Sequence, residues 1–172
     1  MAFPSNASWY TTDPDIGLQP INDTSTTQNH AIGKRVKAKD GNGVYGAAEF
    51  IYLKGVASTA AGDIVIYDEN ANTTTRAVHT TAARGQCAVA MSANVASQYG
   101  WYMISGSCLV NSGANTVAAG APVYLTSTAG QIDDAVVSTD KVDGMTTTAA
   151  NGATTATFTL CQMDRPSANG NG

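Results

Sequence analysis

Short apolar runs separated by Gly-containing turns fill the middle of the chain, from residue 49 to residue 135. None of these runs has the period of an amphipathic helix, and turn signals recur about every 8–12 residues. Such spacing is typical of a β-sandwich or a β-barrel. We therefore predict strands over residues 48–55, 62–68, 74–79, 85–91, 99–106, 121–126 and 130–135.

A lysine-rich segment precedes these runs and alternates between two faces. Lys34, Val36 and Ala38 share one face, and Arg35 and Lys37 lie on the opposite one. Two interpretations stay open. The segment is either a solvated edge strand, where lysines discourage unwanted pairing, or a contact surface for an acidic protein. In the second case Lys34, Arg35 and Lys37 are interface residues.

Turn-forming residues mark the ends of the first hairpins. The Asp-Gly-Asn-Gly sequence at residues 40–43 predicts a turn after the lysine-rich strand, because Gly and Asn tolerate positive φ. Residues 68–72 (Asp-Glu-Asn-Ala-Asn) predict a second turn. The second turn lacks the residue spacing of a calcium-binding loop.

The C-terminal part contains one further strand pattern. Thr alternates with apolar residues over residues 153–163, after an Asn-Gly turn signal, and this indicates a strand with one buried face. Residues 136–150 are rich in Thr, Ala and Asp and predict a loop around a weak strand. We expect residues 165–172 (RPSANGNG) to form a flexible tail.

The first 32 residues have a different texture. Prolines, aspartates and threonines interrupt every strand or helix period, yet apolar anchors are interspersed, which a disordered linker seldom carries. We predict an extended N-terminal arm that packs either on its own domain or on a neighbouring subunit. Its expected contact residues are Phe3, Trp9, Tyr10, Ile16 and Leu18.

Composition agrees with an all-β fold. The chain has 172 residues, of which 43% are hydrophobic and 13% charged. Only five are Leu, a good helix former, whereas Thr, which suits a pleated sheet, is abundant. We predict a compact β-barrel or sandwich of short antiparallel strands over residues 33–164, between the arm (1–32) and the tail (165–172).

Charge and cysteine usage restrict the partners. A net charge of −4 would repel nucleic acid, and no apolar run reaches the length of about 18 residues that a membrane span needs. No signal peptide is expected at the N-terminus. Cys87, Cys108 and Cys161 lie inside apolar runs, which predicts buried free thiols in a protein made in a reducing cytosol.

Catalytic arrangements are sparse. A Cys–His hydrolase would have to pair His79 with Cys87 or Cys108, and neither thiol lies in a context that activates it. The aspartates at 133, 134, 140 and 143 are a candidate carboxylate cluster, but neighbouring strand residues point to opposite faces, which favours a solvated hairpin end. We predict no enzyme activity, no metal and no cofactor. An enzyme would need His79 to converge with a carboxylate or a thiol.

An aromatic cluster occupies residues 99–102. Alternation places Tyr99 and Trp101 on one face and Tyr102 on the other. Such rings serve either as core or subunit interface, or as a platform that stacks on sugars or bases. We expect Trp101 at a core or interface position.

Three segments resemble one protein family. They are residues 55–68 (GVASTAAGDIVIYD), 88–110 (AVAMSANVASQYGWYMISGSCLV) and 115–135 (NTVAAGAPVYLTSTAGQIDDA). A Gly-Asp strand, an Ala-Val-Ala strand, an Ala-Gly-x-Pro-Val-Tyr strand and a Gly-Gln hairpin follow one another in order. This order resembles the capsid decoration, or cement, proteins of tailed bacteriophage heads.

The resemblance covers about half of the chain and rests on scaffold residues. It implies a compact β-barrel that forms a homotrimer on the outside of the head and stabilises contacts between capsomers of the major capsid protein. It also implies a virion protein made in the host bacterial cytoplasm, with no catalytic residues. The arm residues would then contact the capsid or a neighbouring subunit. The alternative function is a carbohydrate-binding or adhesion module with an aromatic platform.

Overall fold

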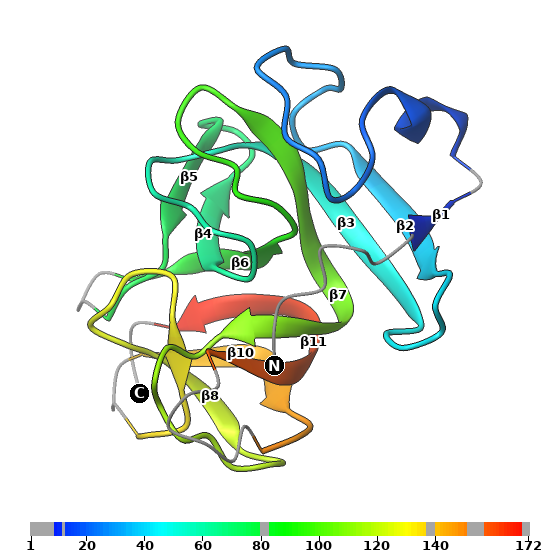
Figure 1. Ribbon diagram of the computed structural model, residues 1–172. Coiled ribbons are helices and arrows are strands. Elements are labelled where there is room, and N and C mark those ends of the chain that lie inside the picture. Colours follow the sequence, from blue (N-terminus) through cyan, green and yellow to red (C-terminus); the bar gives the residue numbers. More distant parts are fainter. Residues whose placement is uncertain (1–8, 12, 80–82, 137–139, 151–156, 170–172) are drawn as a thin grey trace.

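A computed structural model describes residues 9–11, 13–79, 83–136, 140–150 and 157–169. The predicted all-β fold is confirmed. The strands form one antiparallel sheet of 11 strands that is not closed into a barrel and folds into a compact, sandwich-like body (Figure 1).

The elements follow the predicted order closely. They are β1 (Trp9–Tyr10), the 3-10 helix η1 (Pro14–Leu18), β2 (Arg35–Asp40), β3 (Ala47–Lys54), β4 (Ile64–Asp68), β5 (Thr73–Arg76), β6 (Gly85–Ala90), β7 (Tyr99–Asn111), β8 (Pro122–Leu125), β9 (Ile132–Asp133), β10 (Lys141–Thr147) and β11 (Phe158–Asn169).

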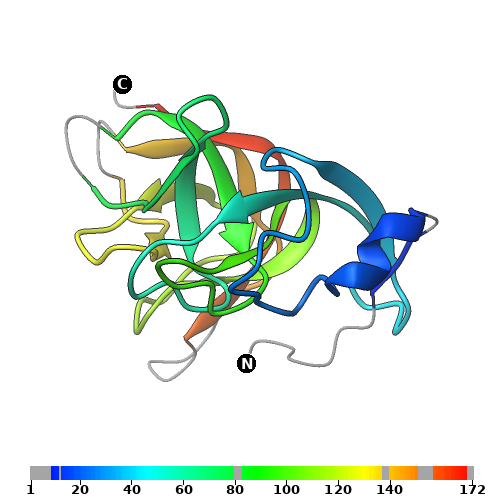
Figure 2. The ribbon, with the colours of Figure 1, turned by 90° about the horizontal axis from the view of Figure 1, so that it is seen from above.

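The strand order is β1-β2-β3-β7-β6-β11-β10-β8-β9, with the β4–β5 hairpin attached to β6. Strands β1 to β3 extend to one side of the body, and β8 to β11 form its lower part in Figure 1. The view from above shows that β1, η1 and the β2–β3 hairpin project from the rest of the molecule (Figure 2). We call β1, β2 and β3 the wing.

Strand β7 lies at the centre and is buried on both faces. Trp101 and Met103 belong to the larger apolar cluster, and Tyr102 and Ile104 to a second cluster on the opposite face. The predicted alternation is therefore confirmed. All four side chains are at most 1% exposed, so the run is continuously apolar because both of its faces are covered.

A bend at Gly106 lets β7 serve two parts of the sheet. Residues before the bend pair with β3, and those from Ser105 to Asn111 pair with β11. Gly106 has φ of 118°, and a Cβ there would lie 2.8 Å from the Cβ of Ala48. Glycine is required here because the backbone conformation and the close approach both exclude a side chain.

The C-terminal strand corrects the expected tail. Strand β11 runs to Asn169 and changes partner on the way, from β7 to β6, where Ser167 pairs with Gln86. Arg165 lies at the corner with φ of 46°, opposite a register shift around Gly144 in β10. The tail prediction is wrong as far as Asn169, because this corner carries the chain past Pro166 and back into the sheet. Residues 170–172 lie outside the described part.

The lysine-rich strand has the predicted alternation: the side chains of β2 are exposed and buried in turn from Arg35 to Asp40. The predicted turn follows it. The Asp40 carboxylate accepts hydrogen bonds from the backbone N–H groups of Asn42 (3.0 Å), Val44 (2.9 Å) and Tyr45 (3.0 Å). Burial raises the pKa of Asp40, but these three donors outweigh it and hold the pKa below its usual value.

The described part of the N-terminal arm packs on its own domain. Ile21 is 3% exposed and belongs to the larger cluster. Ser25 forms an antiparallel bridge with Tyr99, with backbone hydrogen bonds of 3.0 and 2.8 Å. The arm therefore covers the edge of β7 rather than hanging free of the body.

Candidate functional site

The predicted arm contacts divide into two groups. Trp9 packs edge-on against Phe50 at 4.9 Å between ring centroids, and Ile16 packs against the larger cluster. Tyr10 and Leu18 instead project outward, with exposed fractions of 68% and 69%. Phe3 lies outside the described residues. The outer part of the arm therefore presents two apolar side chains to solvent.

The inner part of the arm is anchored through Gln19. Its side chain accepts a hydrogen bond from the Tyr52 hydroxyl (2.7 Å) and donates one to the Tyr99 carbonyl (2.7 Å). The Gln19 carbonyl accepts the indole N–H of Trp101 at 2.9 Å. Trp101 is fully buried within the protomer, so its predicted role at a subunit interface is wrong and its core role is correct.

The three basic residues of the lysine-rich segment also differ in exposure and pairing. Lys34 is half-buried and lies 3.6 Å from the Asp13 carboxylate. Arg35 forms an ion pair with Glu69 at 2.6 Å, and Lys37 is exposed opposite Glu49 in β3. Of the three predicted interface residues, Lys37 is thus the most open to a partner.

The cysteines are buried free thiols, as predicted. Burial raises the pKa of Cys87 and of Cys161 to about 12, and raises that of Cys108 well above its usual value. A thiol that stays protonated is a poor nucleophile. These cysteines therefore fill the core and are unsuited to covalent catalysis.

A His–Asp pair joins two distant segments. The Nδ1 atom of His79, after β5, contacts the carboxylate of Asp140, just before β10. The Asp140 side chain is fully buried, and the His79 side chain is 40% exposed. Such a carboxylate fixes the orientation of an imidazole, so this is the convergence that an enzyme would need. The sequence carries no local signal for it because the two residues are 61 positions apart.

A cavity of about 320 Å³ lies beside this pair and is also lined by Thr126, Ser127 and Thr128. The Thr126 hydroxyl is already bonded within its own loop, to the Thr128 carbonyl and N–H. No hydroxyl in the described part of the chain hydrogen-bonds the imidazole of His79. Among the described residues, the site therefore holds an imidazole and the carboxylate that orients it, without a hydroxyl bonded to the imidazole as in a hydrolase triad.

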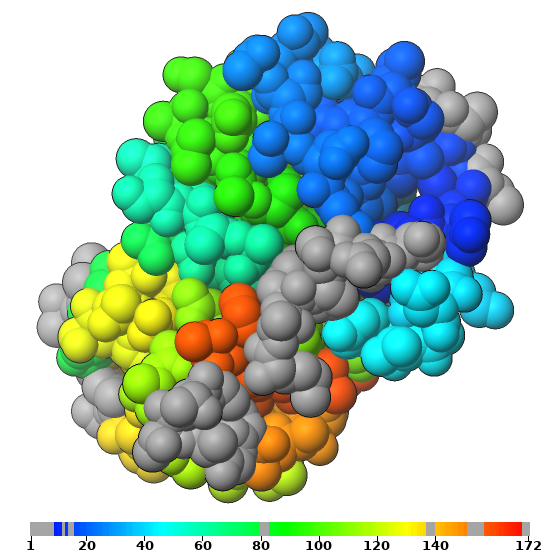
Figure 3. Space-filling view, in the orientation of Figure 1, coloured from blue at the N-terminus to red at the C-terminus, as the bar shows by residue number. Residues whose placement is uncertain are grey.

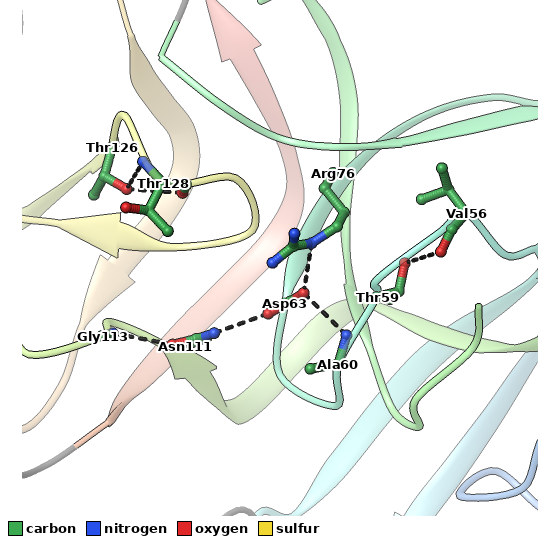
Figure 4. A network of polar contacts seen from close by, with 9 residues as sticks. All are labelled: Val56, Thr59, Ala60, Asp63, Arg76, Asn111, Gly113, Thr126 and Thr128. Carbon is green, nitrogen blue, oxygen red and sulfur yellow. Dashed lines mark hydrogen bonds and ion pairs between the residues drawn. The ribbon is translucent and has the colours of Figure 1, made fainter. Parts of the chain in front are cut away.

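Asp63 organises a second polar centre next to this loop (Figure 4). Its buried carboxylate accepts hydrogen bonds from the Arg76 guanidinium (2.8 Å), the Asn111 amide (2.8 Å) and the Ala60 N–H (3.0 Å). These partners come from three separate segments. The Asp63 charge is satisfied on every side, which makes it a structural cross-link.

A second cavity, of about 620 Å³, lies between the β4–β5 hairpin, the start of β6 and the wing. Two arginines, Arg35 and Arg84, contribute to its lining. Amide and hydroxyl side chains supply most of the remaining polar groups, from Asn70, Thr73, Thr75 and Gln86. We call it the arginine pocket. No local sequence pattern predicts this pocket, because the residues that line it come from four separate stretches of the chain.

The candidate acid cluster, which the sequence already disfavoured, does not assemble among the described residues. Asp134 accepts the Ala118 N–H at 2.8 Å, whereas Asp143 pairs with Lys141 at 3.0 Å, and Asp140 contacts His79. Within the described residues, no three His, Cys, Asp or Glu side chains are grouped as metal ligands. No helix in that part of the chain is long and apolar enough to span a membrane.

Comparison with known proteins adds no identity. No protein-family model matches the chain, and no curated protein matches it significantly.

Proposed function

We propose that this protein is a structural virion protein that binds the outside of a bacteriophage head and stabilises contacts between capsomers of the major capsid protein. The resemblance of residues 55–68, 88–110 and 115–135 to decoration proteins supports this role. The confirmed all-β scaffold agrees with it.

The observation that carries the proposal is the division of the arm. Gln19 and Ile21 fix its inner part in the core, while Tyr10 and Leu18 project from its outer part. A large apolar side chain on a fixed support can bury itself against a partner with little loss of conformational entropy. Figure 3 shows the N-terminal segment in blue spread over the upper part of one face, beside the wing.

A capsid partner and a second copy of the chain are both part of this proposal. The expected homotrimer would place three outer arms on one head, and simultaneous binding of three weak contacts raises the overall affinity without new contacts. The proposed location is the capsid exterior, after synthesis in the host cytoplasm.

The test is co-sedimentation with undecorated phage heads. The Tyr10→Ser/Leu18→Ser double variant should bind at least about tenfold more weakly than the wild type, because two apolar side chains no longer reach the partner. Val136→Ser is the matched control, since Val136 is 78% exposed but lies near β10. It should bind like the wild type.

Unchanged head binding by the double variant would contradict the proposal. Removing residues 1–32 altogether is the weaker test, because it also removes Gln19 and Ile21 from the core. Loss of binding would then report unfolding as much as a lost contact.

The alternative, a carbohydrate-binding or adhesion module, would need another binding site. The rings of Trp101 and Tyr102 are fully buried and present no face to a sugar, and Tyr99 is partly covered by the arm. The polar lining of the arginine pocket is the observation that supports this alternative.

A further inference from the structure

The arginine pocket combines two arginines and two carboxylates, Asp68 and Glu69, with neutral hydrogen-bonding groups. The Asp68 carboxylate accepts the N–H groups of Asn70 and Ala71 in its own turn. Arg35 enters from β2, and Arg84 lies just before β6. Guanidinium groups bind carboxylates through two parallel hydrogen bonds. The amides of Asn70 and Gln86 and the hydroxyl of Thr75 both donate and accept hydrogen bonds, as the hydroxyl groups of a sugar require.

The pocket already contains a carboxylate in the position of a ligand. Glu69 lies 2.6 Å from the Arg35 guanidinium, and both side chains are exposed, at 36% and 42%. Exposed ion pairs contribute little to stability, so a carboxylate from outside can replace Glu69 with little loss of stability. The Glu69 side chain can then turn toward solvent.

Tyr67 fixes the wall behind this ion pair. It is 7% exposed and belongs to the second apolar cluster, so its ring is held in place. Burial raises the pKa of Tyr67, while the neighbouring Arg35 charge and hydrogen bond act in the opposite direction. The phenol therefore stays protonated at neutral pH and can donate a hydrogen bond.

We propose that the arginine pocket binds a carboxylate-bearing saccharide, with its carboxylate on Arg35 in place of Glu69 and its hydroxyl groups on the amide and hydroxyl side chains of the pocket. A cavity of about 620 Å³ lies within the usual range for small-ligand sites. An acidic peptide could also engage the arginines, and the relative affinity of the two ligand classes decides between them. This activity goes beyond capsid binding and gives the particle a means of attaching to acidic glycans.

Three small ligands separate the contributions. D-galacturonic acid carries both a carboxylate and sugar hydroxyls, D-galactose lacks the carboxylate, and acetate lacks the sugar. Isothermal titration, with amide NMR shifts at Thr75 and Gln86 as a second readout, should show galacturonate binding at least about tenfold more tightly than either of the others.

Two substitutions should change the affinity for galacturonate in opposite directions. Arg35→Gln should weaken it about tenfold, because the ion pair is lost. Glu69→Gln should strengthen it several-fold, because the internal competitor is gone. Lys141→Gln removes an exposed cation of β10 and should change nothing. Arg35→Lys keeps the charge without the planar fork and should fall between the wild type and Arg35→Gln.

Three outcomes would overturn the proposal: equal affinity for acetate and galacturonate, an acidic peptide that binds more tightly than the sugar acid, or no gain in the Glu69→Gln variant. Head binding should be the same in wild type and Glu69→Gln. The saccharide site and the capsid role therefore succeed or fail separately.

Discussion

The two halves of the N-terminal arm differ in what holds them. Residues 19–32 are held by hydrogen bonds to the core, which Gln19 and Ser25 form with partners on β3 and β7. In the outer part, residues 9–11 and 13–18, Trp9 is partly covered while Tyr10 and Leu18 project. The difference shows that one extended segment can serve as structure at one end and as a contact surface at the other.

The largest expected effect is the contrast between substitutions at two neighbouring residues, Gln19 and Leu18. Gln19→Ala should lower the free energy of unfolding by about 2–4 kcal/mol, because the buried Tyr52 hydroxyl and the half-buried Asn29 amide lose their partner. Leu18→Ala should change it by less than about 0.5 kcal/mol, since the side chain is already exposed. Urea titration measures both values. Similar losses in the two variants would erase the distinction between the inner and outer arm.

A smaller effect on stability is expected at Asp40 in β2. This residue pairs with Trp9 of the outer arm. Asp40→Asn should lower stability at neutral pH by about 1–2 kcal/mol, because a neutral amide accepts hydrogen bonds less strongly than a carboxylate.

The difference in stability between the wild type and Asp40→Asn should also depend on pH in a defined direction. The pKa of Asp40 is lower in the folded protein than its usual 3.8. Its contribution is therefore fully present above pH 3.8 and is lost as the pH falls through the lower, folded value. Unfolding titrations at several pH values should show the wild type and Asp40→Asn converging in acid. A constant difference would show that Asp40 acts through packing alone.

The smallest effect should come from the ion pair between Asp13 of the outer arm and Lys34, which directly precedes β2. Asp13 and Lys34 are 3.6 Å apart, with side chains 29% and 20% exposed. Asp13→Asn should alter the free energy of unfolding by less than about 0.5 kcal/mol, and salt should reduce even that. Thermal unfolding at low and high salt measures it. A large loss would mean that the outer arm is as firmly fixed as the inner part.

Local patterns were sufficient to predict much of the fold. The alternation of residues 99–104 correctly separated Trp101 from Tyr102, and the Asp-Gly-Asn-Gly sequence correctly marked the turn after β2. Such patterns succeed because side-chain direction in a strand and positive φ in a turn depend on near neighbours. Alternation alone, however, could not show that both faces of β7 are covered.

The features that were missed depend on contacts between distant residues. His79 meets Asp140 only because the loop after β5 lies beside the start of β10. Residues 165–172 were expected to form a tail because Pro, Gly and Asn make up most of them, yet pairing with β6 and β10 keeps the chain in the sheet as far as Asn169. The arginine pocket likewise exists only after β2, the β4–β5 hairpin and β6 have come together.

Strand β7 has a mechanical consequence for the whole molecule. Its 13 residues pair with β3, β6 and β11, so this one strand connects the wing to the lower strands. Neither part can separate from the other without breaking hydrogen bonds along β7. A force applied to β3 is therefore transmitted through β7 to β11, and these three strands should separate only together.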